Sequence, residues 1–385
     1  IYDRIFTDKF YIHEDVIYQY GAEKSIADKL QTEESKALEL VNDYPVKAWY
    51  ASFEAYCEEH RGYIQDSEGL WGYTYNPNAK WDWWQIGGRF SRNFLVKEDL
   101  EDYETDSLKI IMTVRDGKND QKLQDEVVEE ILDAGCDILV VDLVDRTEPS
   151  NIIKMAKNEN IPVIFFNREP VREDLMQWDK LYYVGGDARQ SGTMQGEIAA
   201  QVIRTDHSVD RNADGKIQYV LLEGETGHQD AIIRTDSVVK TLQEQGITLE
   251  KLSYQFANWN RGQAENKMTQ LIHHYGDEIE LVLSNNDEMA MGAVAAYEAS
   301  GYPKENRPVI FGIDGLDSAL DAIQNDLIQG TVYNDRAGQA EQISRLAMDL
   351  FQGKEPEGYD FENERYIFLP YQKVTAANVE EFLNR

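Results

Sequence analysis

The chain has 385 residues, of which 42% are hydrophobic, enough for two or three domains with sizeable cores. Its net charge of −33 argues against nucleic acid or an anionic membrane surface as a partner, because both repel such a field. The two cysteines, Cys57 and Cys136, have no CxxC pairing, which excludes a Cys-rich zinc site and a disulfide scaffold.

The aliphatic runs are all short, so no segment is expected to span a bilayer. The sequence starts at Ile1 without a basic, apolar leader. We therefore expect a signal peptide to be absent or already removed.

Residues 1–105 differ in character from the rest and are predicted to form a small α+β module of unknown role. Their most prominent stretch is "NPNAKWDWWQIGGRF", Asn76 to Phe90, which resembles a motif of small phage- or prophage-encoded proteins of unknown role. Its aromatic residues favour the core of a small domain over a binding ledge. The acidic run "KEDLEDYETD", Lys97 to Asp106, is predicted to be a linker.

From Leu108 onwards, short β-rich runs alternate with helical patterns. The expected strands are almost continuously apolar, as in parallel strands that are buried on both faces. They are "LKIIMT", "CDILVVDLV", "IPVIFFN", "KIQYVLLEG", "IELVLSN", "RPVIFGID" and "GTVYND". Short loops and crossover helices then imply doubly wound α/β sheets, whose ligands bind at the carboxyl ends of the strands.

The segment "DRNADGKIQ", Asp210 to Gln218, matches the first positions of an EF-hand calcium loop. Gly215 lies where that loop turns sharply, but the twelfth position is Leu221 in place of a bidentate Glu. The residues alone therefore leave two alternatives. The segment is either a hydrated polar turn or a calcium loop whose last carboxylate comes from elsewhere in the chain.

Polar or aromatic residues follow most of the expected strands. An Asn or Asp in this position is commonly a helix N-cap, but a whole series of such strand ends also suits a ligand rich in hydroxyl groups. An indole suits the apolar face of a pyranose. Arg234, one helical turn after Asp230, pairs with that acid by default or donates to a hydroxyl group. The candidate binding residues are Asn167, His228, Asp230, Arg234, Trp259, Asn286, Asp314 and Asn334.

Six segments in order carry a family resemblance: "IPVIFFNREP", "YVLLEGETGHQDAIIRT", "ANWNRGQAENKM", "NNDEMAMGAVAAYEASG", "VIFGIDGLDSAL" and "GTVYNDRAGQA". Over residues 106–385 the chain resembles the galactose/glucose-binding proteins, which are type I periplasmic substrate-binding proteins of sugar transporters. The resemblance implies two lobes joined by three crossings. One lobe would comprise residues 106–187 and 334–366, and the other residues 188–333 and 367–385.

The resemblance also implies roles for the candidate residues. Trp259 would stack on one face of a hexose, and the other seven residues would hydrogen-bond its hydroxyl groups. The family's calcium loop has nine residues and borrows its bidentate Glu from a later strand, which here falls at Glu280. The implied calcium ligands are Asp210, Asn212, Asp214, the Lys216 carbonyl, Gln218 and Glu280. An all-oxygen set of this kind suits Ca²⁺ over Zn²⁺.

One part of the family pattern is missing. In the family a first strand and helix precede the unit that begins at Leu108, and the following loop supplies one more acid and a second aromatic ring. The stretch "NFLVKEDLEDYETD" is too acidic and too short to replace them, and the pattern of "DRIFTDKFYI" does not match. Because the first strand is central to its sheet, we expect an incomplete lobe with unpaired neighbours, unless residues 1–105 complete it.

A sugar receptor without enzymatic activity is therefore the leading hypothesis, with transporter subunits as partners and an extracytoplasmic location implied by the resemblance. A sugar-responsive regulator of the same fold is disfavoured, because residues 1–60 show no basic helix-turn-helix pattern. An enzyme acting through the first block is also disfavoured, since His13 and His60 are isolated there. A fusion of a phage-type module with a truncated binding protein, without a single function, is a further alternative.

Overall fold

The structure is a computed structural model that describes residues 63–65, 71–73, 99–100, 103–105, 108 and 110–383. The chain divides into two compact units, Ile1–Glu98 and Asp99–Arg385. In the first unit, β1 (Tyr63–Gln65) pairs antiparallel with β2 (Trp71–Tyr73), Tyr63 opposite Tyr73. The predictions for Asn76–Phe90, His13 and His60 fall outside the described residues.

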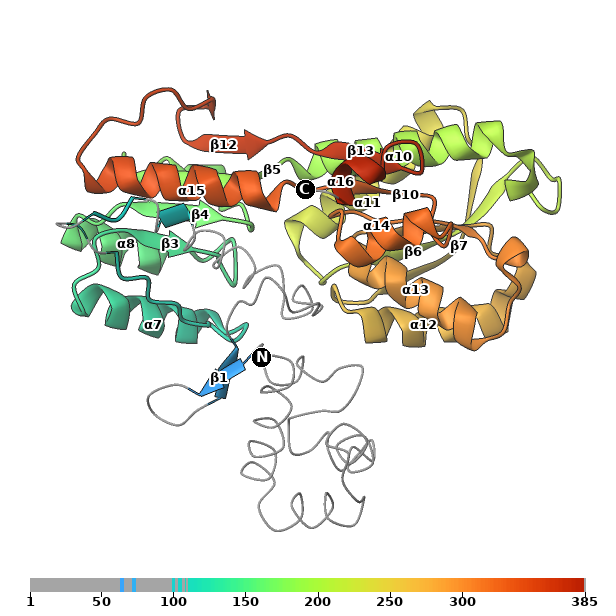
Figure 1. Ribbon diagram of the computed structural model, residues 1–385, viewed down its shortest axis with the longest axis horizontal. Coiled ribbons are helices and arrows are strands. Elements are labelled where there is room, and N and C mark those ends of the chain that lie inside the picture. Colours follow the sequence, from blue (N-terminus) through green and yellow to red (C-terminus); the bar gives the residue numbers. More distant parts are fainter. Residues whose placement is uncertain are drawn as a thin grey trace, which may run out of the picture. The chain divides into compact units, whose positions relative to one another are not determined.

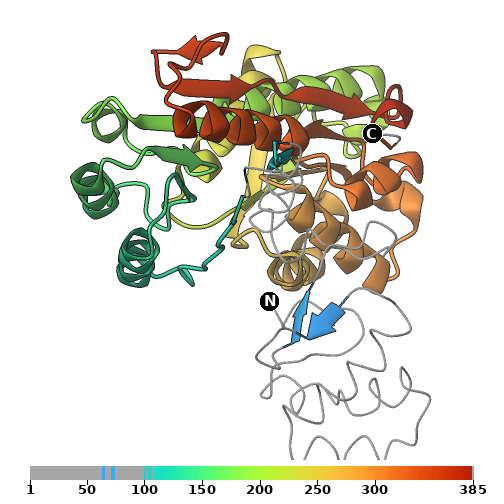
Figure 2. The same cartoon turned by 60° about the vertical axis from the view of Figure 1, so that its left-hand side comes forward.

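The second unit contains two β-sheets with helices around them (Figures 1 and 2). The first sheet has five strands in the order β11-β12-β5-β4-β3, where β12, β5, β4 and β3 are parallel neighbours. Its strands are β3 (Leu139–Val141), β4 (Val163–Phe166), β5 (Leu181–Gly186), β11 (Phe361–Glu362) and β12 (Tyr366–Leu369). Its helices are α7 (Gln121–Asp133), α8 (Ser150–Glu159), α9 (Arg172–Leu175) and α15 (Arg336–Phe351).

The second sheet has six strands in the order β13-β10-β9-β8-β6-β7, parallel except for the antiparallel edge strand β13. Its strands are β6 (Ile217–Glu223), β7 (Leu249–Phe256), β8 (Leu281–Ser284), β9 (Val309–Phe311), β10 (Gly330–Tyr333) and β13 (Gln372–Thr375). Its helices are α10 (Ala188–Thr205), α11 (Gln229–Glu244), α12 (Arg261–Tyr275), α13 (Asp287–Ala299), α14 (Asp317–Gln324) and α16 (Glu380–Leu383). Short 3-10 helices are η2 (His207–Val209), η3 (Gly276–Glu278) and η4 (Lys304–Asn306).

Each sheet has its own hydrophobic core. Val163, Phe165 and Leu181 are fully buried in the first, and Phe311 and Val332 are fully buried in the second. In the second lobe, α10 packs with α11 and α12 packs with α13, and the two pairs cover opposite faces of the sheet (Figures 1 and 2). Because helices cover both faces of the sheet, the strand residues on both faces are mostly apolar. The predicted doubly wound, two-lobed α/β fold is confirmed.

The chain passes between the sheets three times: after β5, after β10 and after β12. α15 therefore returns to the first sheet, where it packs on β5 and β12. Within the described residues no helix is long and apolar enough to cross a membrane.

The prediction of a strand at "LKIIMT" is wrong. Leu108 forms only an isolated bridge with Thr105, residues 110–117 lie in no helix or strand, and the Ile111 side chain is 89% exposed. Among the described residues β3 is the edge of its sheet and pairs with β4 alone. An extended segment needs a neighbour to form a ladder, and none of the described strands lies beside β3 on that side.

Candidate functional site

The candidate binding residues lie at carboxyl ends of strands, and most of them follow neighbouring strands of one sheet. Since the second sheet runs β10-β9-β8-β6-β7, the residues that follow these strands form an arc across its edge. In sheet order they are Asn334, Asp314, Asn286, His228 with Asp230, and Trp259. The structure therefore brings together seven of the eight candidates, Arg234 included, because it follows Asp230 on α11.

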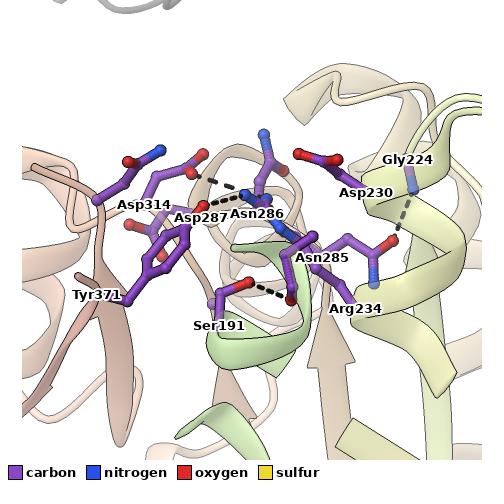
Figure 3. A network of polar contacts seen from close by, with 12 residues as sticks. Ser191, Gly224, Asp230, Arg234, Asn285, Asn286, Asp287, Asp314 and Tyr371 are labelled. Carbon is purple, nitrogen blue, oxygen red and sulfur yellow. Dashed lines mark hydrogen bonds and ion pairs between the residues drawn. The ribbon is translucent and has the colours of Figure 1, made fainter. Parts of the chain in front are cut away.

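Figure 3 shows the middle of this arc. The side chains of Asp314, Asn286 and Asp230 project to the same open side, with Arg234 beneath them. Two candidates also have the capping role considered for them: the Asn286 side chain accepts from Met289 N, and the His228 side chain accepts from Asp230 N. Capping fixes the orientation of both side chains at the start of their helices.

Arg234 is the buried cation of the site, with 5% of its surface exposed. Its Nη1 donates to the Asn285 carbonyl at 2.9 Å and lies 3.8 Å from Asp314 Oδ1. Its Nη2 donates to the Tyr371 hydroxyl at 3.1 Å. Burial alone would lower the pKa of the guanidinium, but Tyr371, Asp314 and Asp230 raise it above its ordinary value. The guanidinium is therefore charged and offsets the nearby carboxylates.

Trp259 stands at the end of the arc. Its ring lies 5.1 Å from that of His228, edge to face, and 5.9 Å from the Arg234 guanidinium. A Cβ atom on Gly224 would come within 2.2 Å of the indole, so only glycine leaves room for it there. The indole is held by contacts on several sides, as a stacking surface for a ligand would need to be.

Three candidate residues have positive φ angles: Asn167 at 61°, Trp259 at 60° and Asp314 at 124°. Such conformations are uncommon for residues other than glycine and cluster at functional sites, where the surrounding structure holds them. Positive φ also occurs outside the candidate binding residues, as at Asn160 and Asp326, so it is consistent with a binding role at the three positions without identifying them.

Asn167 is the candidate from the first sheet, at the end of β4. Its Nδ2 lies 3.3 and 3.2 Å from the two carboxylate oxygens of Asp142, which follows β3. The Tyr183 hydroxyl donates to the Asn167 carbonyl at 3.0 Å. The sequence reasoning missed Asp142, although it obeys the same strand-end rule.

A cavity of about 220 Å³ lies between the strand ends of the two sheets. Arg146, Arg168 and Glu169 line it from the first lobe, and His228 and Asp230 are among its residues from the second. Burial first, and then Asp230, raises the pKa of the Glu169 carboxyl, while Arg146 opposes the shift. Glu169 and Arg168 directly follow Asn167, and the sequence reasoning did not single them out. Together the cavity and the arc thus offer carboxylates, amides, guanidinium groups and an indole.

The candidate calcium loop lies apart from the cleft, before β6. The Asp214 amide donates to Asn212 Oδ1 at 2.8 Å, and the Gly215 amide donates to Asp210 Oδ2 at 2.9 Å. Gly215, at φ 77°, and Ala213, at φ 56°, give the loop its sharp turn. Gln218 Nε2 donates to Asp214 Oδ2 at 2.9 Å, so the predicted ligand side chains lie close together.

Glu280 joins this loop from just before β8. Its carboxylate accepts from Arg211 N at 2.6 Å and from Gln218 N at 3.1 Å, and its side chain is only 2% exposed. The Lys216 Nζ lies 2.9 Å from the Glu250 carboxylate. Its side chain is thus engaged elsewhere, and its backbone carbonyl is the group that was predicted as a calcium ligand. No three His, Cys, Asp or Glu side chains of the described residues gather as a metal-binding group, so a cation here needs amide and carbonyl oxygens too. The donor set that adjoins Glu280 fits a hard cation of this kind.

Two lobes of parallel sheet, joined by three crossings and facing each other across a polar cleft, define the class of two-lobed solute-binding proteins. The comparisons agree. The model of the periplasmic binding protein domain matches residues 75–355, and the chain belongs to this family. The match begins within the N-terminal block, ahead of residue 106.

Individual relatives are similar over about three quarters of the chain. The D-galactose/methyl-galactoside binding periplasmic protein MglB of Haemophilus influenzae is 37% identical over 288 residues, covering 74% of this chain and 85% of the relative. A xylitol-binding protein of Mycolicibacterium smegmatis is 26% identical, covering 74% of each chain. The solved ABC transporter solute binding protein of Bacillus halodurans with bound myo-inositol is 27% identical, with a TM-score of 0.65, covering 77% of this chain and 93% of that one.

Proposed function

We propose that this protein binds a hexose, D-galactose or D-glucose, in the cleft between its lobes and presents it to the membrane subunits of an ABC transporter outside the cytoplasm. The proposed activity is binding without catalysis. One observation carries it: the arc of Asn334, Asp314, Asn286, His228 with Asp230, and Trp259 across neighbouring strand ends.

The chemistry of that arc matches a sugar. Carboxylate and amide groups accept from and donate to ring hydroxyls, while an indole covers the apolar C–H face. Arg234 is already charged and buried, so a ligand hydroxyl that accepts from it encounters a fixed donor with little reorganisation. The two relatives are named for binding of D-galactose or methyl-galactoside and of xylitol, and the solved structure contains bound myo-inositol. All of these ligands are small polyhydroxylated molecules.

Among the residues that the structure describes, β3 is the edge of its sheet, and this position bears on affinity. If the acid and the second aromatic ring of the family's first loop have no replacement, two charged hydrogen bonds and a stacking contact are lost. Their loss costs about 3–5 kcal/mol, or two to four decades in the dissociation constant. In that case we expect affinity for a hexose to be weaker than a complete cleft would give.

Calcium is the proposed structural cofactor. Asp210, Asn212, Asp214, Gln218 and Glu280 would hold it through side-chain oxygens and Lys216 through its carbonyl. The burial of the Glu280 carboxylate beside the loop supports this, because a buried acid gains from a nearby cation.

The test is isothermal titration of the full chain with D-galactose, D-glucose and myo-inositol in millimolar calcium. Saturable heat with D-galactose or D-glucose supports the proposal. Binding of myo-inositol alone would move the substrate class from hexoses to cyclitols, and no heat with any of the three at millimolar concentration would refute sugar binding.

A further inference from the structure

The carboxylate of Asp287 lies at the centre of the strand ends without belonging to the arc. Asp287 is the first residue of α13, directly after Asn286, and is completely buried. Its Oδ2 accepts from Leu316 N at 2.8 Å, and its Oδ1 accepts from Thr331 Oγ1 at 2.6 Å. One carboxylate thus joins α13 to the loop after β9 and to strand β10.

Backbone contacts extend this junction to the candidate binding residues. Asp287 N donates to the Ile313 carbonyl at 2.7 Å, and Asp314 N donates to the Val332 carbonyl at 2.8 Å. Asn334 N in turn donates to the Asp314 carbonyl at 3.0 Å. The loop, β10 and the start of α13 are therefore tied together around Asp287.

Asp314 needs such support, because its φ of 124° is unfavourable for any residue except glycine. Two neighbouring glycines make the close approach possible. A Cβ atom on Gly312 would come within 2.0 Å of Asp287 Oδ1, and Gly315, at φ 70°, would meet the Tyr333 ring at 2.5 Å. Figure 3 shows Asp287 next to Asn286 and beside Asp314.

We propose that Asp287 is a positioning residue that holds the side chains of Asn286, Asp314 and Asn334 in the geometry in which they meet the ligand. It acts through these three residues and does not touch the ligand itself. Positioning for a sugar rests on the proposed function, whereas the junction at the strand ends does not.

The chemistry at Asp287 distinguishes two substitutions. An asparagine keeps the shape, an oxygen that accepts from Leu316 N, and an amide that donates to Thr331 Oγ1. An alanine removes both partners and leaves two buried donors unsatisfied. Asp287→Asn is therefore the conservative variant and Asp287→Ala the disruptive one.

Glu223→Ala is the matched control. Glu223 is a buried carboxylate of the same sheet, 2% exposed, that accepts from Thr235 Oγ1 at 2.8 Å and from the Tyr254 hydroxyl. Neither partner is a candidate binding residue. Its loss is expected to lower thermal stability without changing the geometry around Asp314.

The experiment measures hydrogen exchange of the Leu316 and Asn334 amides and the affinity for D-galactose in all three variants. In Asp287→Ala we expect both amides to exchange at least tenfold faster than in Glu223→Ala, and galactose to bind at least tenfold more weakly. In Asp287→Asn we expect both quantities to stay within about threefold of wild type. If Asp287→Ala does not fold, Thr331→Val replaces it, because this substitution keeps the side-chain shape and removes one hydrogen-bond donor to Asp287. Faster amide exchange and weaker galactose binding are again expected.

Equal exchange of both amides in Asp287→Ala and Glu223→Ala would overturn the inference, whether or not the wild type binds a sugar. Faster exchange with unchanged galactose affinity would overturn it as well. A wild type that binds no galactose contradicts the hexose assignment alone, and the exchange comparison then decides whether Asp287 holds the strand ends.

Discussion

Arg168 and Glu225 form an ion pair across the cleft, with Nη2 of the arginine 2.6 Å from Oε2 of the glutamate. Arg168 follows β4 of the first lobe, and Glu225 follows β6 of the second. Their side chains are only 11% and 31% exposed, so solvent screens the pair less than a surface pair. Gln229 Nε2 and Glu169 Oε2, 3.4 Å apart, make a second contact between the lobes.

We expect Arg168→Ala to shift the sugar-free protein towards a more open arrangement of its lobes. A partly exposed pair contributes about 1 kcal/mol, which corresponds to roughly a fivefold change in the ratio of closed to open molecules. Small-angle X-ray scattering would detect it as a larger radius of gyration. Lys240→Ala, which removes an exposed pair with Glu244 on α11, should leave the radius unchanged. An equal effect of both variants would contradict a specific role for Arg168.

Removal of calcium should lower the melting temperature if Glu280 and the loop Asp210–Gln218 hold this ion. At calcium concentrations about 1,000-fold above the dissociation constant, the bound ion stabilises the fold by about 4 kcal/mol. Differential scanning fluorimetry with and without EGTA measures the shift. Glu280→Gln should abolish the response to calcium, and Glu278→Gln, at an exposed position in η3, should retain it. A melting temperature independent of calcium in the wild type would contradict the site.

Trp259→Ala should weaken binding of galactose by about tenfold or more, because a stacked ring contributes about 0.5–1.5 kcal/mol beyond the apolar area it buries. Isothermal titration measures the loss. Trp178→Ala is the control, since this tryptophan packs beside Lys180 and the core of the first lobe, away from the arc. If both substitutions weaken binding equally, the stacking role of Trp259 is wrong.

Most of the fold and the residues of the arc could be predicted from the sequence, because a buried parallel strand is a short run of apolar residues and the polar residues that follow it are adjacent in the chain. β4, β6 and β8 are buried at every position and mostly apolar, and the next helix starts within a few residues. The order of the strands in the sheet cannot be read from local sequence. The sequence therefore predicted Asn334 and Trp259 as site residues, but it did not show that they lie at the two ends of the arc. Asp142 was missed although it follows β3, and its contact with Asn167 could not be read from the sequence. Asp287 also follows its strand, but its contacts with the loop after β9 and with β10 join distant segments and are not visible locally.

The strand prediction at "LKIIMT" was wrong because strand formation also depends on residues that are distant in the sequence. Its apolar residues suit a strand, but a strand also needs a neighbour, and β-propensity measures fit to such a surface more than an intrinsic preference. Ile111→Ser should therefore change the free energy of unfolding by less than about 0.5 kcal/mol, since the side chain is 89% exposed. Phe165→Ala, in the core of the same lobe, should cost about 3–5 kcal/mol. Chemical denaturation measures both, and a large cost at Ile111 would show that this side chain is covered in solution.

The buried carboxyl of Asp287 should make stability depend on pH. Burial first, and then the charge of Asp314, raises its pKa from 3.8 to about 7, although Thr331 and the Leu316 and Gly315 amides act in the opposite direction. Between about pH 4 and 7 the folded protein therefore keeps a proton that the unfolded chain has lost, so the contribution of this group to stability falls as the pH rises through that window. Asp287→Asn is neutral throughout and lacks this dependence. The difference in unfolding free energy, variant minus wild type, should rise from pH 4 to pH 7 by up to an amount on the order of 4 kcal/mol and then level off. Urea denaturation of both proteins across this range measures it, and a difference that stays flat would show that Asp287 is ionised in the folded state at every pH tested.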